Sequence, residues 1–286
     1  MSDRLVSVVI PMYNEKKDIP YCIRSLKAQT HKKIELILVD DGSTDTTIRV
    51  ANDTARKEKI KIKILNQKHG GPGKARNFGA KNSKGEILIF VDSDMTFDKD
   101  YIKNLIKPIN KEVIGTTHDN EIVLNTKNIW SRCWGHIRVS PKDADKVKIF
   151  RAIDRKKFLD LGGFDPDYGY ADDQTLWFKH KVKPIVAKNT VCYHKNPENL
   201  KQIYSQSRWI GASIDNLFTR TKIVNKLFPF FLYLISPIAI PTLSLMKSMK
   251  LKKVSVVFPM FVFMTIRYFG TISGITRKAY LDINYR

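Results

Sequence analysis

Two carboxylates separated by a single residue follow an apolar run in the first third of the chain. Asp92 and Asp94, with Ser93 between them, come directly after the sequence ILIFV (Ile87–Val91). Two carboxylates on a tight turn are typical ligands of a hard divalent cation such as Mg²⁺ or Mn²⁺, and such a cation in turn binds a diphosphate. An Asp-x-Asp pair alone is a weak signal, because it also occurs by chance in surface loops. Its meaning therefore depends on the elements around it.

The first hundred residues alternate short apolar strands with helices. Strands are predicted at Val6–Pro11, Ile34–Asp41, Ile60–Leu65 and Glu86–Asp94. Most of these runs are rich in β-branched residues and lack polar alternation, which is typical of strands buried on both faces. Helical spacing follows at residues 18–29, and a Gly/Pro turn leads into a helix within Gly70–Ser83. The alternation predicts an α/β fold: a doubly wound, mostly parallel sheet with helices on both faces.

Polar residues mark the carboxyl ends of three of these strands. They are the segment Pro11–Glu15 (PMYNE), the pair Asp40-Asp41 and the turn Asp92–Asp94. In parallel sheets, ligands bind beyond the carboxyl ends of the strands. The three segments therefore predict one shared binding site, the alternative being that they only solvate the loops that they begin.

The composition is that of a globular chain with a strong positive charge. Its 286 residues include 50 Lys and Arg against 28 Asp and Glu, a net charge of +22, and 43% of them are hydrophobic. This hydrophobic content excludes general disorder, and the length fits one large domain or one domain with an appendage. Three widely separated cysteines, Cys22, Cys133 and Cys192, support neither a disulfide framework nor a zinc site.

The last part of the chain is both basic and strongly hydrophobic. Residues 217–286 contain 11 Lys and Arg and one acid, so they carry +10 of the net charge. Basic residues that flank apolar runs favour an anionic membrane surface as the partner, and we expect no nucleic acid. The sequence thus predicts a domain at 1–216, with halves at 1–97 and 98–216, and a membrane-associated helical hairpin at 217–286.

This tail contains two stretches of spanning length. Leu227–Met246 is uncharged but contains three prolines, and Val254–Thr276 is interrupted by Arg267. Four lysines within Lys247–Lys253 separate the stretches. Two full spans would place these lysines opposite the domain, against the positive-inside tendency of a cytoplasmic domain. We favour a hairpin in the inner leaflet of the cell membrane, with the domain on the cytoplasmic side; two spans and a soluble hairpin are the alternatives.

Four motifs occur in the order and spacing of a known enzyme family. VSVVIPMYNE, ELILVDDGSTD, GPGKARNFGA and ILIFVDSD, spread over residues 5–97, resemble the family 2 glycosyltransferases with the GT-A fold. The segment Gly162–Lys179 is similar to the acceptor-site segment of that family. The resemblance implies a UDP- or GDP-linked sugar as donor, a lipid-linked or glycan acceptor, transfer with inversion, and Mg²⁺ or Mn²⁺ as cofactor.

The resemblance assigns donor-side roles to three groups of residues. The group that would hold the base and ribose consists of Pro11, Tyr13, Glu15, Val39 and Asp41. The group at the diphosphate and metal consists of Asp92, Ser93, Asp94 and His194, with Asp94 as a direct metal ligand. The group of cations near the donor consists of Lys74, Arg76 and Arg208. The alternatives are that Arg76 is a solvated helix residue and that His194 is structural.

On the acceptor side, the resemblance implies that Asp173 is the general base. A positioned base speeds attack by a hydroxyl by roughly 10² to 10⁴. Asp172 stands where the family usually has Glu, so the acceptor stays open; alternatively, Asp172 caps the helix predicted at Gln174–His180. Arg208-Trp209 does not match the QxxRW motif of processive synthases, because Gln206 is only two residues before Arg208.

Three other functions compete with this reading. A polyprenyl (dolichyl) phosphate sugar synthase attacks with an oxygen that is already ionised, so it needs no base such as Asp173. A sugar-phosphate nucleotidyltransferase has a similar sheet but more often a Gly-rich, basic N-terminal loop, unlike PMYNE. A non-catalytic membrane adaptor would not need Asp41, Asp92, Asp94 and Asp173 together. We therefore expect a metal-dependent hexosyl- or glycosyltransferase.

Overall fold

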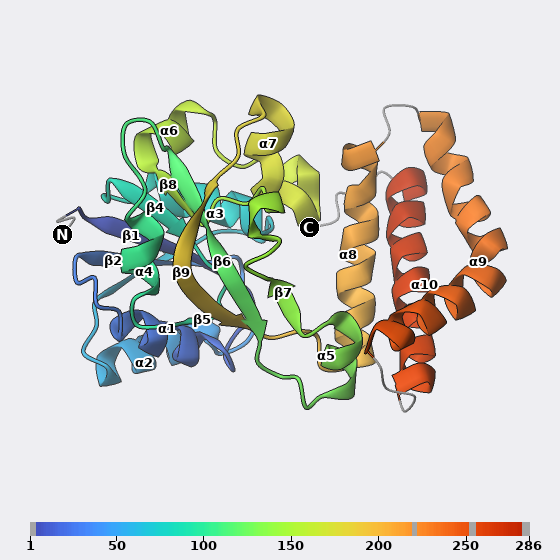
Figure 1. Ribbon diagram of the computed structural model, residues 1–286. Helices are drawn as coiled ribbons and strands as arrows, with labels where there is room; N and C mark the ends of the chain where they lie inside the picture. Colours follow the sequence, from blue (N-terminus) through green and yellow to red (C-terminus); the bar gives the residue numbers. More distant parts are fainter. Residues whose placement is uncertain (1–3, 219–221, 252–255, 282–286) are drawn as a thin grey trace. The chain divides into compact units, whose positions relative to one another are not determined.

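A computed structural model of the protein describes residues 4–218, 222–251 and 256–281, which pack as two compact units (Figure 1). Unit 1 consists of the described residues up to Ile122 together with Ile137–Pro166 and Asp172–His194. Unit 2 consists of Val123–His136, Asp167–Ala171 and the described residues from Lys195 onward. The predicted division into domains at 1–216 and 217–286 stays a prediction. The two units of the structure divide the chain differently, because the helix Leu200–Phe218 belongs to the same unit as the tail.

Unit 1 is built on one mixed sheet. Its described strands are β1 (Val6–Met12), β2 (Ile34–Asp40), β3 (Ile62–Asn66), β4 (Ile87–Phe90), β5 (Thr96–Phe97), β6 (Gly115–Val123), β7 (Ile137–Val139), β8 (Ala152–Asp154) and β9 (Ile185–His194). Their order is β3-β2-β1-β4-β8-β6-β9-β5, and β7 pairs with β6. The first four strands of this order are parallel, whereas β8 pairs antiparallel with β4 and β6, and β5 antiparallel with β9. The predicted α/β fold is confirmed, and the antiparallel half completes it.

Helices cover both faces of the parallel strands (Figure 1). In unit 1 they are α1 (Ile19–Lys27), α2 (Thr47–Lys57), α3 (Pro72–Lys81), α4 (Tyr101–Ile106), α6 (Arg155–Asp160) and α7 (Thr175–His180), with 3-10 turns η1 (Ala144–Lys146) and η2 (Pro166–Gln174). Side chains of β1 alternate between two cores: Val8 packs with α1 and α4, and Val9 packs with α3 and α6. Because both faces are covered, the strands appear in the sequence as nearly continuous apolar runs.

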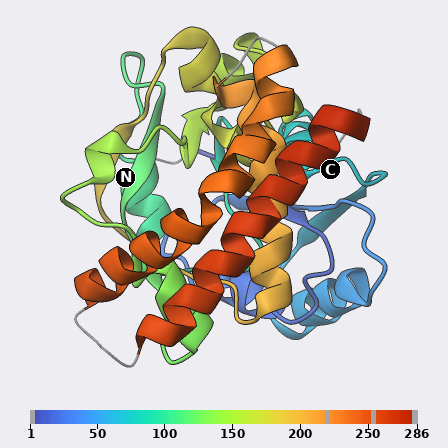
Figure 2. The same ribbon diagram turned by 90° about the vertical axis from the view of Figure 1, so that its right-hand side faces the viewer.

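Unit 2 consists mainly of helices. They are α5 (Ile129–Trp134), α8 (Leu200–Phe218), α9 (Lys222–Leu251) and α10 (Val257–Leu281). Figure 2 shows α10 lying across α8, with α9 beside it. A Cβ on Gly211 of α8 would collide with the backbone of Thr271, and a Cβ on Gly274 of α10 would collide with the backbone of Arg208. Glycines therefore permit the close crossing of these two helices, as is common between membrane helices.

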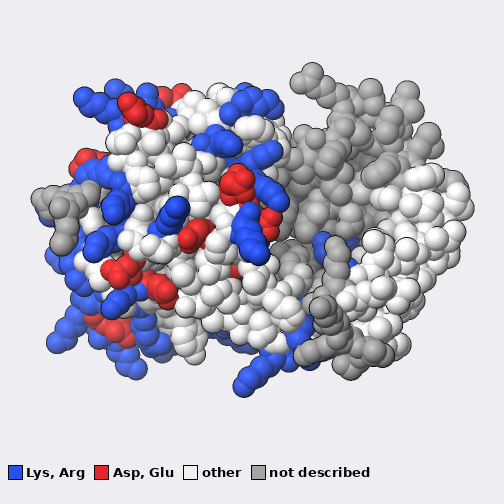
Figure 3. All heavy atoms as spheres, in the orientation of Figure 1, with Lys and Arg blue, Asp and Glu red and all other residues white. Residues whose placement is uncertain are grey.

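Helix α9 turns its large apolar side chains outward. Its buried positions recur every four residues and are mostly small: Ser236, Ile240, Ser244 and Ser248. Its exposed positions include Phe231, Tyr233, Leu234, Ile238, Leu245, Met246 and Met249. On the face shown in Figure 3, the described part of the tail is almost entirely white, while Lys and Arg are spread over the rest of that face. A soluble hairpin would bury the large apolar side chains, so this pattern is typical of helices that face lipid.

Within the described residues, two segments have the length and composition of a membrane span, Phe231–Met249 and Val257–Thr276. The charge within the second, Arg267, lies over the ring of Trp134, 4.4 Å from the ring centroid. Lys252 and Lys253 of the predicted lysine cluster lie outside the described residues, as do residues 254–255 of the second predicted stretch. The two helices fit the membrane-associated hairpin, and whether they span the bilayer or lie in one leaflet stays a prediction.

Candidate active site

The loop after β1 is tied to the loop after β2 by Asn14. Its backbone has a φ of 59°, and its side-chain oxygen accepts hydrogen bonds from the backbone N–H groups of Thr44 at 2.9 Å and Asp45 at 3.2 Å. The N–H of Asn14 in turn donates to Ser43 Oγ at 2.9 Å. The two strand ends that predicted a shared site therefore form one connected rim.

The carboxylate of Asp41 is occupied by the chain itself. It accepts hydrogen bonds from Gln67 Nε2 at 2.6 Å and from the backbone N–H groups of Gly70 and Gly71, both at 2.8 Å. His69 Nδ1 lies 2.9 Å from Asp41 Oδ2. Asp41, the residue that the resemblance assigns to the base, thus shapes the turn that leads into α3.

Asp40, one residue earlier, keeps a carboxylate oxygen without a partner. Its Oδ2 accepts a hydrogen bond from the N–H of Ser43 at 3.0 Å. Its Oδ1 is buried and has no hydrogen-bond partner within the part of the chain that the structure describes. A buried acceptor in this state costs free energy until a donor reaches it. A donor group of a ligand would satisfy it.

The remaining residues assigned to the base and ribose differ in exposure. Tyr13 is exposed, and its ring stacks on His69 with the centroids 4.3 Å apart. Pro11 and Val39 are register partners in β1 and β2 and are buried, with Val39 in the core beneath α3. Tyr13 is therefore the flat surface on this rim against which a base can stack, while Pro11 and Val39 support the rim from below.

Arg76 of α3 joins the two acidic motifs. Its side chain is 8% exposed, and its guanidinium donates to Asp92 Oδ1 at 2.7 Å and to Asp172 Oδ1 at 2.9 Å. Gly73, three residues earlier, makes room for this contact, because a Cβ there would lie 2.6 Å from Asp172 Oδ2. Arg151 approaches the other oxygen of Asp92 at 3.7 Å. Arg76 is thus a buried bridge and not a solvated helix residue.

These cations determine the ionisation of the carboxylate that they share. Burial alone would raise the pKa of Asp92, but Arg76, Arg151 and His194 hold this pKa below its usual range. Burial likewise opposes the charge of Arg76, and Asp92 and Asp172 nevertheless raise the pKa of its guanidinium. Lys74, on the exposed side of α3, has no part in this bridge.

Asp172 and Asp173 lie at the end of η2, directly before α7. Asp172 is buried against α3, and Gln174 is the N-cap residue of α7, so Asp172 does not cap that helix. Asp173 is partly exposed. Burial raises the pKa of Asp172 to about 7 although Arg76 lowers it, and burial also raises the pKa of Asp173. A carboxylate with a raised pKa is a better proton acceptor near neutral pH.

The turn after β4 presents two carboxylates beside a histidine. The side chains of Asp92 and Asp94 are 29% and 28% exposed, and Ser93 between them is buried. His194 Nε2 lies 3.1 Å from Asp94 Oδ2. Burial, together with the nearby Asp94, raises the pKa of Glu15 to about 8. Crowded carboxylates with an imidazole nitrogen favour a divalent cation among them, so these residues fit Mg²⁺ or Mn²⁺.

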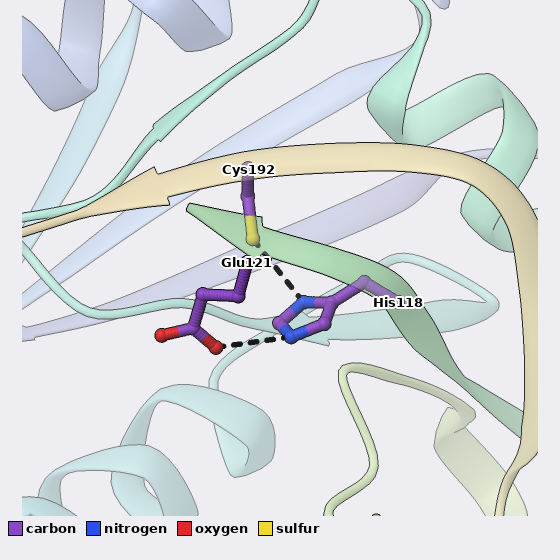
Figure 4. Close-up of side chains that lie close together, drawn as sticks. All are labelled: His118, Glu121 and Cys192. Carbon is purple, nitrogen blue, oxygen red and sulfur yellow. Dashed lines mark hydrogen bonds and ion pairs between the residues drawn. The ribbon is translucent and has the colours of Figure 1, made fainter. Parts of the chain in front are cut away.

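A buried polar cluster lies in the antiparallel half of the sheet (Figure 4). Glu121 of β6 contacts His118 Nε2 at 3.0 Å and His194 Nδ1 at 2.7 Å. Arg151 Nη2 lies 3.6 Å from the same carboxylate. The cluster therefore connects to both sides of the Asp92–Asp94 turn, through His194 and through Arg151. Sequence reasoning missed Glu121, His118 and Arg151, because single polar residues within or beside strands carry no signal of their shared burial.

His118, Glu121 and Cys192 are also possible ligands of a metal ion. Their arrangement opposes this, because Glu121 contacts Nε2 of the His118 ring whereas Cys192 Sγ contacts Nδ1 at 3.4 Å (Figure 4). Burial lowers the pKa of His118 and raises that of the Cys192 thiol, and the nearby Arg151 disfavours a second cation. The cluster is better described as a closed hydrogen-bond network.

Arg208 belongs to α8 of unit 2, and its predicted contact with the diphosphate stays a prediction. The adjacent Trp209 packs edge-on against Tyr170, with ring centroids 5.2 Å apart. Tyr170 is 38% exposed, so this aromatic pair presents a surface to solvent. Tyr170 lies three residues before Asp173 in the sequence.

The chain matches the family model described as Glycosyl transferase family 2 over residues 7–160. It is 35% identical over 254 residues to glycosyltransferase GlyA of Streptococcus pneumoniae serotype 4, covering 79% of this chain and 36% of GlyA. It is 34% identical over 128 residues to poly(ribitol-phosphate) β-N-acetylglucosaminyltransferase TarS of Staphylococcus aureus, covering 44% of this chain and 22% of TarS. The matched parts thus span about a third of GlyA and about a fifth of TarS.

Two solved structures share the fold. Mannosyltransferase PcManGT from Pyrobaculum calidifontis, in complex with GDP-Man and Mn²⁺, has a TM-score of 0.60 at 17% identity, covering 95% of this chain and 88% of PcManGT. A fragment of S. aureus TarS in complex with UDP-GlcNAc has a TM-score of 0.51 at 18% identity, covering 99% of this chain and 93% of the fragment. The GT-A fold implied by the four sequence motifs is therefore confirmed.

Proposed function

Because the chain belongs to glycosyl transferase family 2, we propose that it moves a sugar from a nucleotide sugar to a hydroxyl of a lipid-linked or membrane glycan acceptor, with inversion. The observation that carries this proposal is the Arg76 bridge between Asp92, on the donor side, and Asp172, beside the base Asp173. One buried guanidinium fixes the groups that are needed on both sides of the transferred sugar, and fixed geometry of this kind lowers the barrier to reaction.

The chemistry follows from the ionisation of these groups. Asp173 removes the proton of the acceptor hydroxyl while the oxygen attacks the anomeric carbon, opposite the departing nucleoside diphosphate. The new bond to the acceptor forms as the bond to the diphosphate breaks. Asp92, Asp94 and His194 would hold the divalent cation, which offsets the negative charge on the departing diphosphate.

A donor screen on the detergent-solubilised full chain tests this function. We expect one UDP- or GDP-sugar to release its nucleoside diphosphate with Mn²⁺ and not with EDTA. We expect Asp94→Ala to lower this release by about 10²- to 10³-fold, because the charge on the leaving group is then left uncompensated. Asp143→Ala, which removes a surface carboxylate, is the matched control. Release that survives both EDTA and Asp94→Ala would contradict the metal role.

We infer that Asp40, rather than Asp41, accepts the hydrogen bond from the base of the donor. Asp40→Asn is expected to weaken binding of UDP or GDP by about 10- to 100-fold with little change in stability, because hydrogen bonds to charged groups contribute about 1.5–3 kcal/mol. Asp41→Asn is expected instead to lower the free energy of unfolding by about 1–3 kcal/mol, because backbone N–H groups of the turn lose their acceptor. Calorimetry and urea unfolding measure the two effects. If Asp41→Asn instead weakened nucleotide binding and Asp40→Asn lowered stability, the hydrogen bond from the nucleotide base would be assigned to Asp41.

The outward apolar face of α9 supports attachment to the cell membrane, with unit 1 on the cytoplasmic side. We expect the protein to stay with the membrane pellet after alkaline carbonate treatment. Replacing two outward residues, Ile238→Asp and Leu245→Asp, should move part of it to the supernatant, because carboxylates are costly in hydrocarbon. Asn52→Asp, on the exposed surface of α2 in unit 1, adds a carboxylate away from both membrane segments and serves as the comparison. Release of the wild-type chain would contradict spanning.

A further inference from the structure

His194 stands between two carboxylates. It is the last residue of β9, and the neighbouring strand β6 contributes Glu121. The Nε2 atom of the ring lies 3.1 Å from Asp94 Oδ2, on the side of the proposed metal site. The Nδ1 atom lies 2.7 Å from Glu121 Oε1, on the buried side. The two nitrogens of this buried ring therefore face different carboxylates, and Arg138 Nη1 lies beside both, 2.7 Å from Nδ1 and 3.1 Å from Nε2.

Glu121 is a buried carboxylate, so nearby groups must compensate its charge. It is 3% exposed in the interior of the antiparallel half of the sheet. Besides the two histidines, Arg138 Nη1 lies 3.5 Å and Arg151 Nη2 lies 3.6 Å from its oxygens. Transfer of an ionised carboxylate into a protein interior is costly unless such partners compensate it. The surrounding cations keep Glu121 ionised, and a permanent negative charge is thus fixed behind His194.

A histidine that binds a metal through one nitrogen usually donates a hydrogen bond from the other nitrogen to a carboxylate, which fixes the tautomer and raises the basicity of the ligand. The Glu121–His194–Asp94 arrangement has this form. Without a metal, the ring donates to both carboxylates, from Nδ1 to Glu121 and from Nε2 to Asp94. A bound cation would replace the proton of Nε2, while Glu121 keeps the hydrogen on Nδ1. Glu121 also limits the repulsion that Arg138 and Arg151 would exert on a bound cation.

We propose that Glu121 is the positioning residue of the metal site, holding His194 so that Nε2 binds the divalent cation together with Asp94. The proposal rests on the metal-dependent function proposed above. A purely structural role for Glu121 predicts only a loss of stability when it is changed. The positioning role predicts in addition a loss of metal affinity in a protein that is still folded.

Mn²⁺ provides a readout that does not depend on turnover. Wild-type protein with Mn²⁺ and either GDP or UDP is examined by electron–nuclear double resonance, which detects a nitrogen bound directly to the ion. We expect a nitrogen coupling that disappears in His194→Gln. Titration of Mn²⁺, followed through the signal of the free ion, then gives the dissociation constant. Glu121→Gln keeps the shape of the side chain and removes its charge, and we expect it to weaken Mn²⁺ binding by about 10- to 100-fold.

A matched control variant distinguishes a positioning role of Glu121 from a purely structural role. His118→Gln removes the other imidazole from Glu121 without touching His194, so it perturbs the same cluster. We expect its thermal midpoint to fall while its Mn²⁺ affinity stays within about threefold of the wild type, well short of the loss expected for a change in the support of a metal ligand. If Glu121→Gln does not fold, Glu121→Asp, which keeps the charge and withdraws the carboxylate from His194, supplies the Mn²⁺ comparison, and absence of the nitrogen coupling in the wild-type protein would overturn the proposal by itself.

The outcomes distinguish the two proposals. Mn²⁺ that binds without a nitrogen coupling, or equally well to wild type and folded Glu121→Gln, would overturn the role of Glu121 and leave the metal-dependent function intact. A wild-type protein that binds no Mn²⁺ with GDP or with UDP would overturn both.

Discussion

Asp173→Asn is expected to lower the rate of sugar transfer by about 10²- to 10⁴-fold, while donor binding changes by no more than about twofold. The amide has the shape of the carboxylate but cannot accept the proton of the acceptor hydroxyl. Asp173 is partly exposed beside the Arg76 bridge, where an acceptor can reach it. Transfer is measured with membranes that contain the acceptor, and donor binding by calorimetry.

The same variant should not be less stable than the wild type. Burial raises the pKa of Asp173, so the ionised form is disfavoured in the folded state. For an acid with a raised pKa, stability falls as the pH rises through that pKa, and a neutral side chain avoids this loss. We therefore expect Asp173→Asn to melt at the same temperature as the wild type in acid and at a higher temperature at pH 8. An inactive variant that melts higher has lost a base rather than its fold.

Two results would argue against this base. If Asp173→Asn retained most of its transfer activity, the acceptor would be a group already ionised, as in a polyprenyl-phosphate sugar synthase. If the surface variant Asp143→Asn lost as much activity as Asp173→Asn, the effect would reflect charge in general, since Asp143 is exposed and contacts the surface residues Lys146 and Ser140. The comparison of the two variants thus separates the position of the carboxylate from its charge.

The parallel half of the fold could be predicted because its signals are local. The apolar runs at β1, β2 and β4 are buried on both faces, and polar residues begin at their carboxyl ends. A shared site at this edge was predicted from this alignment, because the ends of parallel strands lie along one edge of the sheet. The roles of individual residues within this site were harder to predict from the sequence. Nothing in Asp40-Asp41 shows that Asp41 is saturated by a turn 26–30 residues away while Asp40 keeps a free oxygen.

The antiparallel half carries the parts that could not be predicted. Its strands are short or rich in polar residues, and β6 reads GTTHDNEIV, which indicates a surface strand. Glu121 and His118 are nevertheless buried, because their partners His194 and Arg151 come from β9 and the segment before β8. Pairing of buried charges depends on register between distant strands. A single sequence does not contain that information.

Loss of the Arg76 side chain is expected to destabilise unit 1 strongly. Arg76→Met keeps much of the buried volume and leaves Asp92 and Asp172 facing each other without their shared cation. Removal of one partner from a buried ion pair typically costs about 3–5 kcal/mol. Arg56→Met removes an exposed guanidinium that contacts Asp53 at 2.6 Å, and such surface pairs contribute about 0–1 kcal/mol. Urea unfolding of the full chain in detergent, read by pulse proteolysis, measures both.

A second substitution distinguishes lost packing from uncompensated charge. If the cost of Arg76→Met is electrostatic, removal of the charge on Asp172 should recover part of it, because the remaining Asp92 still has Arg151 at 3.7 Å. The double variant Arg76→Met/Asp172→Asn is therefore expected to be more stable than Arg76→Met alone by about 1–3 kcal/mol. Purely additive losses would mean that Arg76 acts through packing, and the bridge would then hold no electrostatic link between the donor and acceptor sides. Recovery of stability in the double variant would show that Arg76 links Asp92 and Asp172 through its positive charge. The proposed transfer requires this electrostatic role of Arg76.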